Sequence, residues 1–201
     1  PRGSGDSVPL RLAGGFHALA RAKADERLAR LYAGELAGAD AVVRDVLQRF
    51  DAALAPWLDS PPQTNETGRA GPIMAGLLAL AAEQGLPFEL IELGASAGLN
   101  QNLDRFGYRL GETRAGDPAS PLQLAPAWEG PSPPEAEVRI AARRAVDQAP
   151  VPVSDPAQRE RLAAYCWADQ TERMQRLEAA LALAAIHPPK VGKGDAADFV
   201  E

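Results

Sequence analysis

Apolar residues recur at helical spacing through the first part of the chain and then give way to shorter extended runs. From about Leu10 to Leu58 they follow the period of an amphipathic helix, with a break near Gly34–Gly38, which predicts two or three helices. A further apolar helix is expected from Ile73 to Ala82, closed by Gly85. The alternating run Phe88–Leu93 predicts a strand.

Helical and extended segments alternate after that strand. The pattern predicts a short helix over Leu99–Arg105, an extended segment over Val138–Val146, a long helix over Asp155–Ala185 and a short strand over Lys190–Lys193. The Gly- and Pro-rich stretch at about 106–134 is typical of an insertion with irregular structure or a small hairpin. This order favours an α/β fold with a largely parallel sheet.

The segments divide the chain into a helical N-terminal part, residues 5–62, and an α/β domain, residues 63–201. Residues 1–4 resemble the remains of a cleavable tag. The chain ends just after the last predicted strand and its loop, where a doubly wound sheet normally continues. We therefore expect a sheet that lacks its later strands, with self-association through its uncovered edge or poor order over 194–201.

Composition narrows the function classes. A net charge of −6 with no clustered basic stripe argues against nucleic acid or a membrane surface as the partner. No apolar run reaches the roughly 18 residues of a membrane span, and no signal peptide is visible. The single cysteine, Cys166, excludes an internal disulfide, and His17 and His187 lack partners at metal-ligand spacing. We therefore predict a cytoplasmic protein without a metal site.

The segment from Glu92 to Gly98 carries the strongest chemical signal. A strand followed by a glycine-rich turn and a helix can gather backbone N–H groups around a small polar ligand. The dinucleotide fingerprint would need glycine at Ser96 and Leu99, so that match fails. The pattern Gly-x-Ser-x-Gly fits the nucleophile elbow of α/β-hydrolases. With Glu92 two residues before Gly94, the segment also resembles the first motif of class I S-adenosylmethionine-dependent methyltransferases.

Two later segments resemble the same methyltransferases. Arg144–Pro150, a hydrophobic strand ending in Asp147, is similar to their second-strand signature, and Val191–Ala196 is similar to the Gly-Asp-Ala that ends their third strand. The resemblance covers about residues 63–201 and implies a Rossmann-like methyltransferase sheet. It departs from the family in spacing, because Gly94 and Asp147 lie 53 residues apart (147 − 94) where about 20 is usual. The insertion accounts for this difference only if it loops out of the sheet.

The resemblance also implies S-adenosylmethionine as cofactor. Its methionine end needs hydrogen-bond donors and a fitting shape, its ribose diol an acceptor pair and its adenine amine an acceptor. The implied cofactor-binding residues are Glu92, Gly94, Ala95, Ser96, Gly98, Asp147, Gln148, Asp195 and Ala196. Purely structural roles compete with this one: close packing for the turn, an ordinary strand-end carboxylate for Asp147 and a helix N-cap for Asp195.

Four motifs resemble a bacterial family known only as a domain of unknown function and grouped with methyltransferase-like folds. They are Gln63-Thr-Asn65-Glu66-x-x-Arg69, Leu93–Asn100, Gly116–Pro121 and Trp167–Arg173. This resemblance implies a fold and a cofactor but no substrate. Gln63, Asn65 and Arg69 are candidates for the mouth of the site, or they cap and flank a helix.

Two alternatives stay open. A serine hydrolase would use Ser96, then one of Asp147, Asp155 and Asp169, then His187, which is the required chain order. Its elbow would normally follow several strands, whereas the preceding segment is predicted to be helical. A Rossmann-like binding module without catalysis is the other alternative. Methyl transfer itself needs no nucleophilic side chain, so no catalytic residue is identified, and we expect a small molecule as the methyl acceptor.

Overall fold

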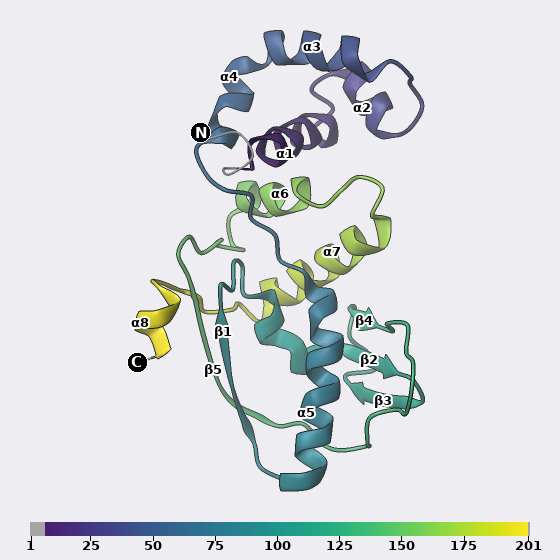
Figure 1. Ribbon diagram of the computed structural model, residues 1–201, viewed down its shortest axis with the longest axis vertical. Coiled ribbons are helices and arrows are strands. Elements are labelled where there is room, and N and C mark those ends of the chain that lie inside the picture. The colour runs from purple at the N-terminus through teal and green to yellow at the C-terminus, as the bar shows by residue number, and fades with distance from the viewer. Residues whose placement is uncertain (1–6, 201) are drawn as a thin grey trace. The chain divides into compact units, whose positions relative to one another are not determined.

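The computed structural model describes residues 7–200, and it shows a mixed α/β protein (Figure 1). The supposed tag remnant at residues 1–4 lies outside the described residues. The chain divides into two compact units. The first comprises Pro1–Thr64 and Pro156–Thr171, and the second comprises Asn65–Asp155 and Glu172–Glu201.

The first unit is helical. Its elements are α1 (Val8–Arg21), α2 (Glu26–Tyr32), α3 (Ala39–Arg49), α4 (Asp51–Leu54), the 3-10 helix η1 (Ala55–Leu58) and α6 (Pro156–Ala164). The predicted break near Gly34–Gly38 falls between α2 and α3, and both of these glycines have positive φ. Phe16, Leu28 and Val46 belong to the buried core of this unit.

Side-chain contacts attach α6 to the N-terminal helices. His17 Nδ1 lies 3.0 Å from the Ala164 carbonyl oxygen, and the Arg161 guanidinium lies 4.4 Å from the centre of the Trp57 ring. The sequence predicted one long helix from Asp155 to Ala185. The structure instead breaks it at 165–170, where a turn closes with Gln170 N–H donating to the Trp167 carbonyl.

The second unit holds all the strands of the described chain. Its elements are η2 (Thr67–Arg69), α5 (Ala70–Gln84), β1 (Phe88–Leu93), η3 (Leu99–Arg105), β2 (Gly107–Leu110), β3 (Thr113–Gly116), β4 (Gln123–Leu124), β5 (Ile140–Asp147), α7 (Thr171–Ile186), β6 (Gly192–Lys193) and α8 (Ala196–Val200). The first strand has the bounds that the sequence predicted.

A parallel sheet with the order β1-β5-β6 positions the candidate site. Leu93 pairs with Val146, and Asp147 pairs with Lys193. Because all three strands run in the same direction, their carboxyl ends meet at one edge of the sheet. The segments that follow them, namely the glycine turn, Gln148 and Gly194–Asp195, therefore lie close together.

The insertion forms a second small sheet with the order β3-β2-β4. The strands β2 and β3 make an antiparallel hairpin, and β4 pairs with β2 in parallel. Helix α5 contacts β2 and η3, and in the view of Figure 1 it runs between the two sheets. The insertion adds no strand to the parallel sheet. It therefore loops out of this sheet, as the long spacing between Gly94 and Asp147 required.

Candidate functional site

The candidate site begins where β1 enters the glycine turn. Gly94, Ser96 and Gly98 have φ values of 66°, 54° and 69°, in the left-handed region that favours glycine. A Cβ on Gly98 would lie 2.6 Å from Val191 Cγ2 and 2.9 Å from Pro189 Cβ, so this glycine permits close packing. A Cβ on Gly94 would meet no atom within 4 Å. The face of the turn at Gly94 is therefore exposed to solvent and accessible to a ligand.

Several backbone N–H groups of the turn already donate hydrogen bonds to other groups of the protein. The N–H groups of Ala95, Ser96 and Leu99 donate to the Val146 carbonyl, the Asp147 carboxylate and the Asn65 amide oxygen, at 3.1, 2.7 and 3.0 Å. The sequence predicted that such groups would face the ligand. In the structure they hold the turn in shape, so a ligand would approach through the open face at Gly94.

Asp147 connects the turn to the end of β5. Its Oδ2 accepts the Ser96 N–H, and its Oδ1 accepts the Ala149 N–H at 2.8 Å. This is a structural role for a residue that the sequence proposed as the ribose acceptor. The two roles are compatible, because a carboxylate oxygen can accept more than one hydrogen bond.

Asp195 lies beside Asp147 at the same edge. Its Oδ1 accepts the Ala197 N–H at 2.8 Å at the start of α8, and its Oδ2 lies 3.4 Å from Gln148 Nε2. The Gly194 N–H donates to the Asp147 carbonyl. The structure thus brings the three predicted groups of cofactor residues together, and Asp195 also has the capping role that competed with cofactor binding.

A polar cluster surrounds Glu92, the last half-buried position of β1. Gln101 Nε2 donates to Glu92 Oε2 at 2.9 Å, and the Asn100 side chain also hydrogen-bonds this carboxylate. Burial raises the pKa of Glu92, and these hydrogen bonds together with the nearby charge of Arg69 lower it only in part. The carboxylate is therefore desolvated and supported by amide groups.

Three buried polar atoms, one in the glycine turn and two in the cluster around Glu92, lack hydrogen-bond partners among residues 7–200. They are Ser96 Oγ, Asn100 Oδ1 and Gln101 Oε1. Such atoms are uncommon in folded proteins and often mark an ordered water or a ligand. All three can accept a hydrogen bond, so they suit a group that donates several. Asn100 was predicted only as the end of a family motif and Gln101 was not predicted, although the run of amide side chains Asn100-Gln101-Asn102 behind the turn was a visible signal.

The segment Asn65–Arg69 lies against the turn. Besides the bond from Leu99 to Asn65, Asn100 Nδ2 lies 3.4 Å from the Glu66 carbonyl oxygen. Together with the charge of Arg69 near Glu92, these contacts place two of the three predicted mouth residues, Asn65 and Arg69, beside the turn. The third, Gln63, belongs to the first unit.

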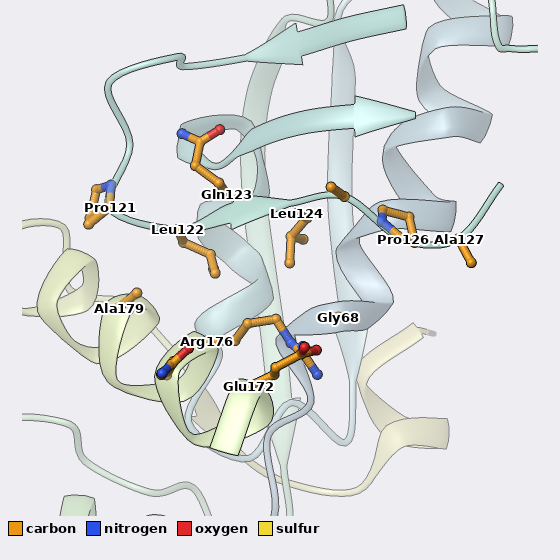
Figure 2. Close-up of a pocket in the computed structure, with 12 residues that line it drawn as sticks. Gly68, Pro121, Leu122, Gln123, Leu124, Pro126, Ala127, Glu172, Arg176 and Ala179 are labelled. Atoms are coloured by element: carbon orange, nitrogen blue, oxygen red, sulfur yellow. The ribbon is translucent and has the colours of Figure 1, made fainter. Parts of the chain in front are cut away.

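A separate groove of about 670 Å³ lies between the β4 segment, residues 121–127, and α7 (Figure 2). Leu122 and Leu124 point from the β4 segment toward the helix, and Glu172 and Arg176 extend from the helix on the other side. Gly68 also lines it. This groove could not be predicted from the sequence, because it depends on packing between segments about 50 residues apart.

The described residues form no Ser–His pair at Ser96, whose Oγ is buried and unpartnered. His187 contacts this region through its backbone carbonyl, which accepts a hydrogen bond from Asn102 Nδ2 at 2.9 Å. Within residues 7–200 no group of three or more His, Cys, Asp or Glu side chains could hold a metal ion. No helix of the same range has the length and apolar character needed to cross a membrane.

Fold and site together define a mixed α/β protein whose parallel sheet ends in a glycine turn with a buried polar cluster behind it. The family model described as "Uncharacterized protein conserved in bacteria (DUF2332)" matches residues 2–201, and the chain belongs to this family. The resemblance to a bacterial domain of unknown function is thereby confirmed. No curated protein and no solved structure matches the chain.

Proposed function

We propose that the second unit binds S-adenosylmethionine at the glycine turn and transfers its methyl group to a small-molecule acceptor. One observation carries the proposal: β1, β5 and β6 are adjacent and parallel, so the glycine turn, Asp147 and Asp195 meet at one edge. Ligands of open parallel sheets bind outside the carboxyl ends of the strands. The order β1-β5-β6 also follows the order in which the sequence motifs resemble those of class I methyltransferases.

The residues present fit the chemistry of this cofactor. Its α-ammonium group donates several hydrogen bonds, and Glu92 with the unpartnered oxygens of Ser96, Asn100 and Gln101 supplies acceptors. The exposed face at Gly94 leaves the turn accessible to the methionine end. The remaining lone pairs of Asp147 would accept hydrogen bonds from the ribose hydroxyls. Asp195 would accept a hydrogen bond from the adenine amine, and the Gln148 amide would donate one to an adenine ring nitrogen.

When bound, the cofactor would supply an electrophilic methyl group on a sulfonium, which would pass to a lone pair of the acceptor and leave a neutral thioether behind. The protein's contribution is to hold the two in line and exclude water. The internal hydrogen bonds of the turn serve this task, since a turn that is already ordered loses little entropy when the ligand binds. The acceptor's proton leaves to solvent or to a base that the sequence does not identify.

The proposal is tested by calorimetric titration of the protein with S-adenosylmethionine and S-adenosylhomocysteine. The decisive variant is Gly94→Asn, because asparagine tolerates positive φ and its side chain would occupy the space at the turn. The matched control is Gly85→Asn, since Gly85 also has φ 66° and open space, but ends α5 before β1 begins.

We expect binding of both ligands to the wild type and to Gly85→Asn, and at least about tenfold weaker binding to Gly94→Asn. Absence of binding to the wild type, or equal affinity in Gly94→Asn, would overturn the proposal. Binding without methyl transfer to any of a broad set of small acceptors would instead support a non-catalytic binding module.

A further inference from the structure

The groove between β4 and α7 contains an arginine whose donors are little used. Arg176 NH2 lies 3.7 Å from Glu66 Oε1, and Arg176 NH1 lies 3.9 Å from Glu172 Oε2. Both distances exceed the roughly 2.7–3.2 Å of an N–H···O hydrogen bond. Arg176 Nε is buried and has no partner within the part of the chain that the structure describes. The terminal NH1 and NH2 groups therefore retain donors for an acceptor that enters the groove, whereas the buried Nε does not face it.

Neither neighbouring carboxylate neutralises Arg176 well. Glu66 is engaged elsewhere: its Oε2 accepts from Arg173 Nε at 2.7 Å, and its Oε1 accepts from the Gly68 N–H at 2.9 Å. The Glu172 side chain is 90% exposed, and an ion pair with so exposed a carboxylate is weak and easily displaced. The positive charge of Arg176 is thus only weakly paired with these two carboxylates.

The opposite wall of the groove is apolar. Leu122 and Leu124 point toward α7 while Gln123 points away, as Figure 2 shows, and Pro126 extends the wall. Ala179 lies on the helix side of the same groove. The volume of about 670 Å³ lies within the roughly 300–1,000 Å³ of small-molecule sites.

We propose that this groove binds a small molecule with a carboxylate at one end and an apolar body. Arg176 would hold the carboxylate through the two terminal nitrogens of its guanidinium, and the exposed Pro126 and half-buried Ala179 would contact the apolar body, since Leu122 and Leu124 are already almost fully buried within the protein. A small molecule is favoured over an added peptide strand, because β4 has only two residues and Pro121 and Pro126 flank it closely. That the ligand is the methyl acceptor rests on the proposed function, and the binding itself does not.

The Asn65–Gly68 segment connects the groove with the glycine turn. Asn65 accepts from the Leu99 N–H behind the turn, whereas Gly68 lines the groove. A ligand in the groove therefore lies near the proposed cofactor site without occupying it. A methyl acceptor in the groove would therefore lie close to the cofactor. We expect the cofactor and the groove ligand to bind at the same time instead of competing.

The test compares three carboxylates, 4-phenylbutyrate, hexanoate and indole-3-propionate, with their uncharged primary amides, by ligand-observed NMR titration of the full chain. We expect at least one of the three acids to bind about tenfold or more tightly than its amide. Arg176→Gln should remove this preference and leave amide binding unchanged. Ala179→Phe should weaken both members of the pair by filling the groove, and the exposed Arg109→Gln on β2 should change neither.

Equal binding of acid and amide in all three pairs would overturn the proposal, as would an unchanged preference in folded Arg176→Gln protein. If Arg176→Gln fails to fold, loss of binding in Ala179→Phe decides the location of the site. Titration with S-adenosylmethionine is run on the same samples. Acid selectivity without cofactor binding would refute only the proposed function, and cofactor binding without acid selectivity would refute only this groove site.

Discussion

Replacing Asp147 with alanine should both destabilise the second unit and free the glycine turn. The carboxylate accepts two backbone N–H groups, one from Ala149 two residues ahead and one from Ser96, 51 residues earlier in the chain. The second bond matters more for the tertiary structure. It fixes the position of Ser96, a non-glycine residue held at φ 54°, against the end of β5.

The magnitude follows from these two bonds. A hydrogen bond to a charged group contributes about 1.5–3 kcal/mol when the group is well buried. Asp147 is only half-buried, and the bond to Ala149 is local enough to persist partly in the unfolded chain. We therefore expect Asp147→Ala to lower the free energy of unfolding by about 2 kcal/mol. Asp147→Asn keeps one acceptor oxygen and should cost about half as much.

Asp117 provides a matched control. Its Oδ1 accepts the Ala119 N–H at 2.8 Å, which reproduces the local bond of Asp147 without a long-range partner. Asp117→Ala should therefore cost less than about 1 kcal/mol.

The measurements are urea unfolding for the free energy and hydrogen exchange for the amides of residues 94–99. Exchange at Ser96 should accelerate in Asp147→Ala and stay unchanged in Asp117→Ala. If the two alanine variants lost equal stability and Ser96 exchanged at the wild-type rate in both, the structural role assigned to Asp147 would be wrong.

Two further variants test the chemistry around the turn. Glu92→Gln should be more stable than the wild type at pH 7, because burial raises the pKa of folded Glu92 above its value in the unfolded chain. In the wild type, the stability that protonated Glu92 contributes is therefore fully present below about pH 4.5. It is lost as the pH rises through the folded pKa. Thermal melts from pH 4 to pH 8 should show this difference growing with pH, together with weaker cofactor binding; a difference independent of pH would contradict the assignment. Ser96→Ala should leave the turn folded, since the Ser96 bond to Asp147 uses the backbone N–H, and should weaken cofactor binding by about tenfold, the loss of one acceptor for the ammonium group; a fluorophosphonate probe should not label the wild type. Stoichiometric labelling that the alanine variant loses would favour the serine hydrolase instead.

The sequence was most informative where local rules decide the structure. The alternating apolar run predicted β1 from Phe88 to Leu93 with its observed bounds, and Gly85 ends α5 at positive φ as expected for a helix C-cap. Strand–helix alternation predicted a parallel sheet, which the structure confirms. These features depend on a few neighbouring residues, so one chain suffices to predict them.

Packing between distant segments could not be predicted in the same way. Nothing local at Ala164 indicates that its carbonyl lies beside His17, 147 residues earlier. The polar cluster could not be predicted for the same reason. In the sequence Gln101 resembles an ordinary helix residue, and only the fold shows that its Nε2 lies 2.9 Å from Glu92 Oε2. A sequence can propose such residues, but only the fold shows which of them meet.

The segment Asn65–Arg69 illustrates how a motif acquires a physical reason. Its asparagine holds the backbone N–H of Leu99 behind the turn, and its glutamate binds Arg173 through one oxygen and the Gly68 N–H through the other. Its arginine places a positive charge near Glu92, which lowers the cost of burying that carboxylate. Helix capping alone, the simpler explanation for these residue types, accounts for the Glu66 bond to Gly68 and for none of the other contacts. The motif is better understood as the structural link between the glycine turn and the groove beside α7, the two places in the second unit where ligands are proposed.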